Sequence, residues 1–136
     1  MKKVFVDTSA FLALLNNSDT WHKKAKEIEL FLNQNRYLWV TTDFVILELG
    51  DALCSVYWRS KFTRFVNVIR DLESISIIPL EKNLFNQGLA LYESRQDKDW
   101  GLTDCISFVI MQRENITEAF TTDKHFEQAG FIRLLI

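Results

Sequence analysis

Short apolar segments with the composition of strands alternate along this chain with longer segments in which apolar residues recur at helical spacing. The strand-like segments are rich in β-branched and aromatic residues, and we expect strands at 4–6, 37–41, 75–78, 119–121 and 132–135. Helices are predicted at about 10–15, 21–33, 43–57, 60–72, 81–94, 103–111 and 123–126. This alternation predicts a Rossmann-like α/β/α sandwich around a central, mostly parallel sheet of four or five strands.

The chain length and charge limit the classes of protein to be considered. With 136 residues, of which 48% are hydrophobic, the chain is expected to form one domain over residues 1–136 with a conventional core. The formal net charge of −2 does not favour a polyanion binder in general. A nucleic-acid contact would therefore need a local basic patch.

The cysteines and the apolar runs bear on the compartment. Cys54 and Cys105 lie far apart and lack the paired spacing of a zinc site, so we expect two buried, reduced thiols. No apolar run approaches the roughly 18 residues that a membrane span needs. Asp7 also interrupts the first apolar run too early for a signal peptide. These features predict a soluble cytoplasmic protein without a membrane partner.

Four acidic residues follow predicted strands or lie near the starts of predicted helices, namely Asp7, Glu48, Asp104 and Asp123. Taken singly, each aspartate is typical of a turn or a helix cap. In a parallel sheet, however, the carboxyl ends of the strands and the starts of the following helices meet at one edge. Open α/β folds bind ligands at that edge. We therefore expect the four carboxylates to converge there.

Glu48 lies in a helix between apolar residues and shares a face with Phe44 and Ala52. A carboxylate in such surroundings must be paired, protonated or bound to a metal, because burying it alone costs several kcal/mol. The alternative is an amphipathic helix that presents Glu48 at its solvated edge beside Asp51.

Converging carboxylates favour a bound cation. Two negative charges ~4 Å apart repel by roughly 4 kcal/mol at an effective dielectric constant of about 20. Hard oxygen ligands without a Cys/His cluster indicate Mg²⁺ or Mn²⁺. Such an ion can activate water and neutralise charge in a phosphodiester transition state, so the pattern predicts metal-dependent hydrolysis.

The same residues carry a resemblance. The segments Val4–Ser9, Leu102–Cys105 and Thr121–Phe126, together with Glu48 in its apolar helix, resemble the PIN domain family over nearly the whole chain. The resemblance implies a Rossmann-like sandwich and a Mg²⁺- or Mn²⁺-dependent ribonuclease that acts on single-stranded RNA. Small stand-alone members are commonly toxins of VapBC-type toxin–antitoxin pairs.

The resemblance also implies roles for individual residues. The catalytic and metal-binding quartet would be Asp7, Glu48, Asp104 and Asp123, with Asp7 and Asp104 as the direct ligands. Further residues that would support the site are Thr8 and Thr121, whose hydroxyls would orient carboxylates or the attacking water, and Asp99 as an outer acid.

Three features bear on these assignments. Asp99 also fits a solvated loop residue. Related sequences often have a serine where this chain has Gly101, from which we expect a local effect on the loop and an intact metal site. Nothing at metal-ligand spacing accompanies His22 or His125, so we interpret both as surface or packing residues.

The predicted partners are an RNA substrate, a small antitoxin protein and a second copy of the chain in a homodimer. The segment 58–65 interleaves aromatic residues with Arg59, Lys61 and Arg64, which are expected to contact RNA phosphates. The slightly longer aromatic-rich stretch 56–65, which includes this segment, is a candidate for an apolar dimer interface. The antitoxin is expected to insert a C-terminal segment with an Arg or Lys into the acidic groove.

Other functions were weighed on particular residues. Phosphatases of the haloacid dehalogenase type need a second aspartate two positions after the first, where this chain has Ser9. Response-regulator receivers need a phosphoacceptor aspartate at the end of the third strand, which here ends at Ile78 before Pro79. A PIN nuclease of RNA processing that is not a toxin, and a non-catalytic PIN-like interaction module, remain as alternatives.

Overall fold

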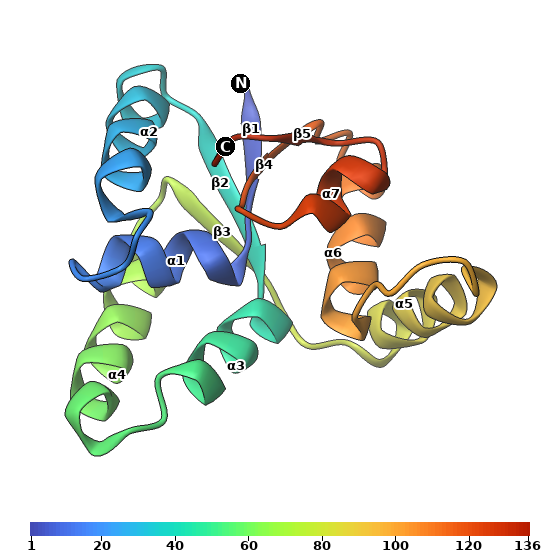
Figure 1. The fold of residues 1–136 in the computed structure, drawn as a ribbon, viewed down its shortest axis with the longest axis horizontal. Coiled ribbons are helices and arrows are strands. Elements are labelled where there is room, and N and C mark those ends of the chain that lie inside the picture. The colour runs from blue at the N-terminus through green and yellow to red at the C-terminus, as the bar shows by residue number, and fades with distance from the viewer.

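Strands and helices alternate along the whole chain in the computed structural model, which describes residues 1–136 (Figure 1). The strands are β1 (Lys3–Val6), β2 (Leu38–Thr42), β3 (Ile75–Ile78), β4 (Glu118–Phe120) and β5 (Ile132–Arg133). The helices are α1 (Thr8–Leu15), α2 (His22–Gln34), α3 (Asp43–Ala52), α4 (Val56–Asp71), α5 (Lys82–Ser94), α6 (Leu102–Arg113) and α7 (Lys124–Gln128). Every element predicted from the sequence is present.

The five strands form one sheet in the order β3-β2-β1-β4-β5, and every neighbouring pair is parallel. In the central strand, Phe5 lies opposite Val40 of β2 and Ala119 of β4. Val4 and Val6 flank Phe5, and all three are fully buried because both faces of a parallel sheet are covered. The predicted Rossmann-like sandwich with a parallel central sheet is therefore confirmed.

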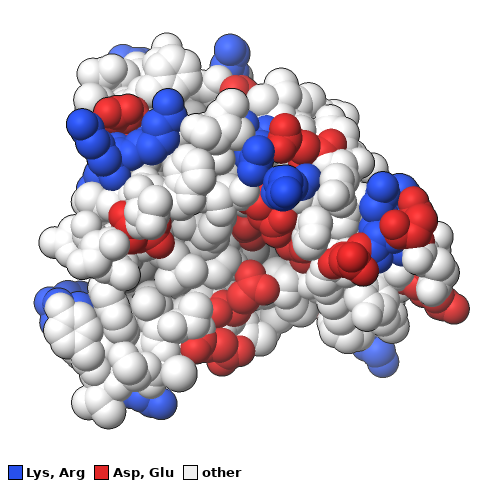
Figure 2. Space-filling view, in the orientation of Figure 1, with Lys and Arg blue, Asp and Glu red and all other residues white.

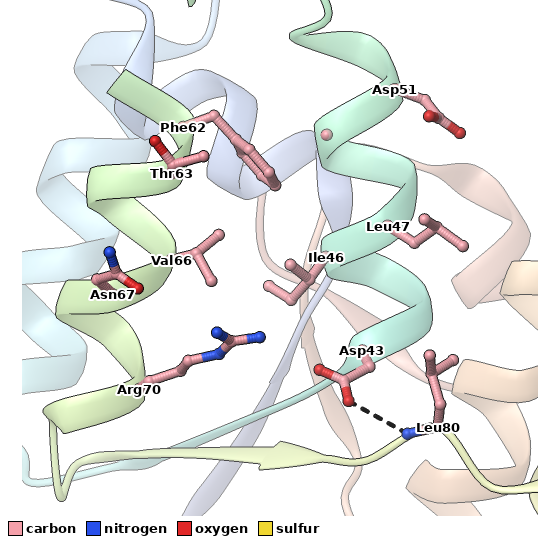
Figure 3. Close-up of a pocket in the computed structure, with 11 residues that line it drawn as sticks. Asp43, Ile46, Leu47, Asp51, Phe62, Thr63, Val66, Asn67, Arg70 and Leu80 are labelled. Carbon is pink, nitrogen blue, oxygen red and sulfur yellow. Dashed lines mark hydrogen bonds between the residues drawn. The ribbon is translucent and has the colours of Figure 1, made fainter. Parts of the chain in front are cut away.

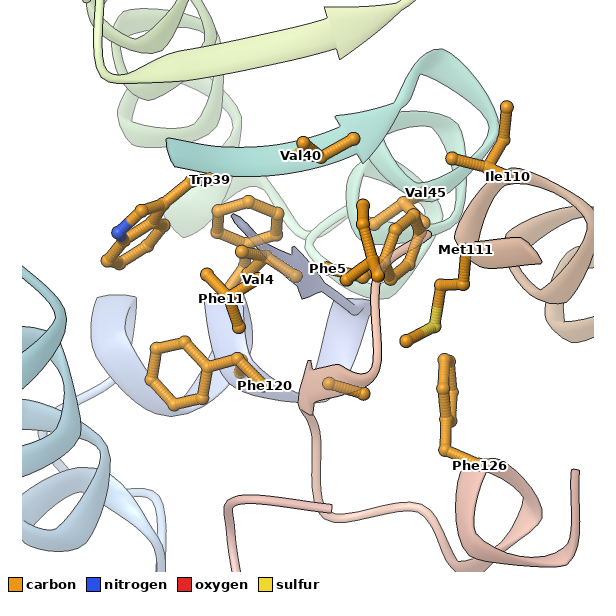
Figure 4. Close-up of a cluster of buried hydrophobic side chains, with 14 of the residues drawn as sticks. Val4, Phe5, Phe11, Trp39, Val40, Val45, Ile110, Met111, Phe120 and Phe126 are labelled. Carbon is orange, nitrogen blue, oxygen red and sulfur yellow. The ribbon is translucent and has the colours of Figure 1, made fainter. Parts of the chain in front are cut away.

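Helices cover both faces of this sheet. Figure 1 places α1, α2 and α4 on one side and α5, α6 and α7 on the other, while α3 extends beyond the end of β2. Aromatic side chains fill the space on both faces (Figure 4). The ring of Trp39 lies 5.7 Å from that of Phe120, edge to face, and Phe126 lies 6.2 Å from Phe5. Pairs of this kind contribute about 1 kcal/mol beyond the burial of their area.

The order of the strands creates a switch point beside β1. The chain runs from β1 to β2 and β3 on one side, and then returns to β4 and β5 on the other. Crevices at such points, beyond the carboxyl ends of the strands, are where open α/β sheets bind ligands. Asp7 follows β1 and Thr121 follows β4, so both border this crevice.

The main difference from the prediction lies between α3 and α4. We expected one helix to continue to about Tyr57 and the next to begin near Ser60, but α3 ends at Ala52 and α4 begins at Val56. Ser55 adopts an extended conformation, and the Arg59 side chain donates a 2.9 Å hydrogen bond to the carbonyl of Cys54. This bond pairs the Cys54 carbonyl, which has no helical partner because the helix is interrupted here. The apolar run 56–58 therefore forms the start of α4.

Smaller differences concern the thiols and the last strand. Cys105 is buried as expected, but Cys54 is exposed because it lies in the break between α3 and α4. Strand β5 has two residues instead of four and follows Gly130, whose φ of 96° suits glycine. None of the helices is long and apolar enough to span a bilayer.

Candidate active site

Asp7 lies at the centre of the switch-point crevice. It follows β1 directly, its N–H donates to the carbonyl of Phe120, and its own carbonyl accepts from the N–H of Ala10 in α1. The side chain makes no capping hydrogen bond to α1 and is only 5% exposed. Asp7 therefore occupies the N-cap position of α1 without capping the helix through its side chain, and its carboxylate is buried for another reason.

Two hydroxyl groups contact this carboxylate from across the crevice. The Oγ1 of Thr121 donates to Asp7 Oδ2 at 2.8 Å, and the Oγ of Ser9 lies 3.5 Å from the same oxygen. Ser9 and Thr121 are themselves 3.1 Å apart, and Ser9 accepts from the N–H of Thr122. These bonds join the ends of β1 and β4. No side chain donates to Asp7 Oδ1, which leaves that oxygen available to a ligand.

Glu48 reaches the crevice from the middle of α3. Its carboxylate accepts a hydrogen bond from the Oγ1 of Thr8, the residue after Asp7. The residue as a whole is exposed, so Glu48 lies at the solvated edge of α3 and still faces the start of α1. Both sequence-based interpretations of Glu48 are thus partly right.

Asp104 and Asp123 meet on the other side of the crevice, with His125 between them. The Nδ1 of His125 lies 3.0 Å from Asp104 Oδ2 and 3.4 Å from Asp123 Oδ1. One ligand atom from each of the three residues can be chosen so that all lie within 4.8 Å of one another. Asp7 and Glu48 belong to no such set of three. The four acids therefore border one crevice, but only Asp104 and Asp123 belong to a group whose ligand atoms lie this close together.

Both aspartates of this second group also take part in helix capping. Asp104 Oδ2 accepts from the N–H of Gly101 at 3.2 Å, and Asp123 Oδ1 accepts from the N–H of His125 at 2.9 Å. The hydrogen bonds of Asp104 thus go to Oδ2, as they do in Asp7, and Oδ1 is left open. The absence of a side chain at Gly101 does not disturb this arrangement.

The carboxylates influence each other's protonation. Burial, together with the negative charges of Asp104 and Glu48, raises the pKa of Asp7 to about 7, although the hydrogen bond from Thr121 acts in the opposite direction. Burial and the charge of Asp123 also raise the pKa of Asp104, while His125 lowers it. Negative charge in the crevice is therefore not fully compensated by the protein.

This electrostatic environment suits a divalent cation. A buried carboxylate whose pKa is raised by neighbouring carboxylates gains from a nearby positive charge. Oxygen atoms dominate the donor set, which fits Mg²⁺ or Mn²⁺, and the single imidazole of His125 is tolerated better by Mn²⁺. The residues present thus fit the ion that the sequence predicted.

Figure 2 shows Asp and Glu atoms gathered in a hollow at the middle of one face of the molecule, with Lys and Arg atoms close to its rim. Of the other residues assigned from the sequence, Asp99 is exposed in the loop before α6 and makes no side-chain hydrogen bond to the quartet. Arg59, Lys61 and Arg64 are exposed on α4, which Figure 1 places on the opposite side of the sheet from α6. Their roles remain predictions.

Sequence reasoning missed two residues of the crevice. His125 was interpreted as a surface or packing residue, yet its imidazole contacts two of the acids. Ser9 was used only to exclude phosphatases, yet it bonds to the segment after β4. The segment Thr121–Phe126 could have indicated the role of His125. Asp123 caps α7, and His125 is the second residue of this helix, where its side chain turns back toward the cap.

A separate groove lies between α3 and α4 (Figure 3). Its volume is about 420 Å³ and its walls include Ile46, Phe62 and Val66. The Asp43 carboxylate at one end accepts a hydrogen bond from the N–H of Leu80. None of the four acids of the crevice lines this groove, so we do not assign the reaction to it.

Comparisons with known proteins cover nearly the whole chain. The chain is 26% identical over 139 aligned residues to the 23S rRNA-specific endonuclease VapC20 of two Mycobacterium tuberculosis strains, and the alignment covers 96% of this chain and 97% of that protein. The crystal structure of Mycobacterium tuberculosis VapC20, described as a sarcin–ricin loop cleaving toxin, superposes with a TM-score of 0.81 and 24% identity, covering 95% and 96% of the two chains.

A second solved structure shares the fold at lower identity. VapBC2 from Rickettsia felis, bound to a DNA fragment from its promoter, matches with a TM-score of 0.71 and 14% identity, covering 96% of each chain. The sequence profile of the PIN domain matches residues 4–132, which include every acid of the crevice. The resemblance noted from the sequence is thereby confirmed, and this chain belongs to the PIN domain family.

Proposed function

We propose that this chain is a Mg²⁺- or Mn²⁺-dependent endoribonuclease that hydrolyses phosphodiester bonds of single-stranded or structured RNA, and that it is the toxin of a type II toxin–antitoxin pair. The observation that carries the proposal is the buried Asp7 carboxylate, whose pKa is raised to about 7 by burial and by neighbouring acids. The similarity to VapC20, which is named as a 23S rRNA-specific endonuclease, supports this class of reaction.

The ion would be held by Asp7 and Asp104 directly, with Glu48 and Asp123 beside them. The open Oδ1 atoms of Asp7 and Asp104 support this choice, because their hydrogen bonds go to Oδ2. When bound, the divalent ion supplies positive charge that makes water more acidic and offsets the charge of the phosphate in the transition state.

The remaining polar groups position these carboxylates. Thr121 fixes Asp7 Oδ2, Thr8 fixes Glu48, and His125 fixes Asp104. Hydrogen bonds of this kind orient ligands and keep the site from rearranging when it loads. Asp7 carries a proton in the ion-free protein below about pH 7, so loading of the site is accompanied by release of that proton.

A matched pair of substitutions on α3 tests the nuclease. Glu48 accepts from Thr8 at the crevice, whereas Asp51 lies three residues further along the same helix and lines the α3–α4 groove. Cleavage of a labelled single-stranded RNA with Mg²⁺ or Mn²⁺ should fall at least about tenfold in Glu48→Gln and stay near the wild-type rate in Asp51→Asn. Equal rates in the two variants would remove Glu48 from the site.

Expression in bacteria separates a toxin from a nuclease of RNA processing. The toxin proposal expects growth arrest on induction, relief by Asp7→Asn, and relief by the co-expressed product of the neighbouring reading frame. Harmless expression of an active nuclease would favour the RNA-processing alternative. A folded protein that binds RNA but never cleaves it would favour the non-catalytic interaction module.

The proposed antitoxin would bring a positive charge into the acidic crevice. Because the carboxylates are incompletely compensated, an Arg or Lys on the C-terminal segment of a small partner would compete with the metal ion there. The similarity to VapBC2 supports a partner of this kind. Both proteins would act in the cytoplasm.

We also propose that the chain forms a homodimer through the aromatic-rich stretch 56–65. At the start of α4, Val56 is 88% exposed and Tyr57 is 65% exposed, and such exposure is costly for large apolar side chains. Analytical ultracentrifugation should give a dimer for the wild type and a monomer for the double variant Val56→Glu/Tyr57→Glu. A dimer in both would exclude this surface as the interface.

A further inference from the structure

A further cavity lies beside the acidic crevice. Of the residues assigned to the site, only Asp99 lines it. Its volume is about 610 Å³, and we call it the α5–α6 pocket. The residues that matter for its chemistry are Tyr92, Arg95, Gln96, Lys98, Asp99 and Trp100. They come from the end of α5 and from the loop to α6, which projects at the edge of the molecule in Figure 1.

The pocket shares a wall with the crevice. Gly101, Leu102 and Cys105 line it from the first turn of α6, and Asp104 lies in that same turn. The N–H of Gly101 donates to the Asp104 carboxylate. Asp104 itself does not line the pocket, so the first turn of α6 lies between the pocket and this carboxylate.

Charges in and beside the pocket cancel. Arg95 donates two 3.0 Å hydrogen bonds to the Asp97 carboxylate, and Lys98 lies 3.8 Å from the same group. Asp97 lies outside the lining of the pocket, and Asp99 is the one acid within it. A phosphate-binding site needs surplus positive charge, which the pocket together with Asp97 does not have. In Figure 2, Lys or Arg and Asp or Glu atoms likewise lie together at this edge of the molecule.

The shape of the pocket is maintained by contacts around Trp100. Its indole N–H donates to Gln128 at 3.0 Å, and the ring is only 5% exposed. The Arg95 guanidinium lies 4.8 Å from the centre of this ring and is held from its other end by Asp97. A flat, pre-positioned guanidinium is thus presented to the cavity without needing a ligand to order it.

Tyr92 provides a second flat surface. It is 50% exposed on α5, its hydroxyl makes no hydrogen bond and its ring contacts no other aromatic ring. Gln96 uses its amide nitrogen to bind the carbonyl of Glu93, which leaves the amide oxygen free as an acceptor. The pocket therefore offers two stacking surfaces with donors and acceptors at their edges.

We propose that the α5–α6 pocket takes one unpaired nucleobase of the RNA, next to the bond that is cleaved. Proteins recognise single-stranded RNA by stacking bases on aromatic rings or guanidinium planes and by hydrogen bonds to the base edges. Tyr92 and Arg95 supply the stacking surfaces, and Gln96, Lys98 and Asp99 supply the polar contacts. The inference rests on the proposed ribonuclease function.

A matched pair of double variants tests the proposal. Tyr92→Ala/Arg95→Ala removes the stacking surfaces, and Phe31→Ala/Arg36→Ala removes an exposed aromatic ring and a guanidinium from the end of α2 and the turn that follows it. Binding is measured by fluorescence anisotropy with Ca²⁺ in place of Mg²⁺, using a single-stranded RNA whose cleavage position has been mapped. A set of the same RNA carries one abasic ribose at successive positions.

For the wild type, an abasic ribose at one position beside the cleavage site should weaken binding on the order of tenfold. In Tyr92→Ala/Arg95→Ala, the intact RNA should bind on the order of tenfold more weakly, and the abasic RNA should suffer no further loss. The control Phe31→Ala/Arg36→Ala should keep the wild-type dependence on that position. Circular dichroism checks that both double variants are folded.

Three results would overturn the proposal, and they are distinguishable. Undiminished position dependence in Tyr92→Ala/Arg95→Ala would show that the base lies elsewhere. If Tyr92→Ala/Arg95→Ala binds all of the RNAs more weakly by the same factor, and its binding depends less on salt, then Arg95 contacts phosphate. Failure of the wild type to bind any of the RNAs would overturn the proposed function as well as the pocket.

Discussion

The imidazole of His125 connects two acids that arrive from different helices, with Nδ1 3.0 Å from Asp104 Oδ2 and 3.4 Å from Asp123 Oδ1. The main-chain N–H of His125 also caps onto Asp123. The histidine therefore fixes the separation of Asp104 and Asp123 in the crevice, and its loss should loosen the site without unfolding the chain.

The effect of His125 can be measured on metal binding. In His125→Ala, the affinity for Mn²⁺ by isothermal titration calorimetry should fall by about 10-fold or more, because residues that orient metal ligands typically contribute that much. His22→Ala is the matched control, since the His22 Nδ1 bonds only to the carbonyl of Ala13. Equal Mn²⁺ affinity in His125→Ala and the wild type would show that the imidazole does not position the site.

Asp7 should make the ion-free protein less stable as the pH rises. Its pKa is about 7 in the folded chain and 3.8 for an unperturbed aspartate, so the folded state binds an extra proton between these pH values. The stabilisation of the folded state by this proton is complete below about pH 4 and lost as the pH rises through about 7, with an upper limit on the order of 4 kcal/mol. Thermal unfolding in EDTA at pH 5 and pH 8 measures the loss.

Asp7→Asn separates this contribution from other titrations. The amide keeps an acceptor for Thr121 and carries no charge, so the variant should lose less stability than the wild type between pH 5 and pH 8. Adding Mn²⁺ at pH 8 should stabilise the wild type and leave Asp7→Asn nearly unchanged. An identical pH dependence in both proteins would mean that Asp7 is not buried as described.

Thr121 should contribute to stability through its hydroxyl group. The residue is fully buried, and its Oγ1 donates to Asp7 and accepts from the N–H of Asp123. Thr121→Val keeps the shape but leaves these buried groups unpaired, at a cost of about 1–3 kcal/mol in the free energy of unfolding. Urea denaturation measures it. Thr121→Ser, which keeps the hydroxyl, should lose less than half as much, and equal losses would assign the effect to packing.

Gly101 should tolerate a side chain. Its φ is −71°, and a Cβ built there would come no closer than 3.7 Å to Asp104 Oδ2. Gly101→Ser should therefore change the free energy of unfolding by only a few tenths of a kcal/mol, in the stabilising direction expected of a better N-cap. A loss of more than about 1 kcal/mol in urea denaturation would show that this loop needs glycine.

The sequence predicted the fold best where apolar residues recur with the period of a strand or a helix. The runs at β1 and β2 alternate with helical periods, and this pattern alone predicted the parallel sheet and the position of Asp7 at its edge. The sequence predicted the structure less well where a helix ends without a proline or glycine. The residues 53–55 are apolar or small, and the end of α3 depends on how α4 packs, which no local signal encodes.

Side-chain contacts across the crevice were also beyond local reasoning. The bond from Thr8 to Glu48 joins residues 40 positions apart, and that from Thr121 to Asp7 joins residues 114 apart. The pattern of strand ends and helix starts supplied the four acids, and the resemblance to the PIN family implied their roles. His125 becomes part of the site only through the turn after β4. The sequence suggested Asp99 either as an outer acid or as a solvated loop residue, and it is exposed in the lining of the α5–α6 pocket.

The central claim is that carboxylates at the end of β1 and at the start of α6 form one metal-dependent site for RNA hydrolysis. Single-turnover cleavage of a single-stranded RNA with Mn²⁺ tests it most directly, with wild type, Asp7→Asn, Asp104→Asn and the control Asp51→Asn compared in one series. We predict cleavage that is abolished by EDTA, that falls at least about 100-fold in Asp7→Asn and Asp104→Asn, and that persists in Asp51→Asn. Cleavage at the wild-type rate in both Asp7→Asn and Asp104→Asn would contradict the account.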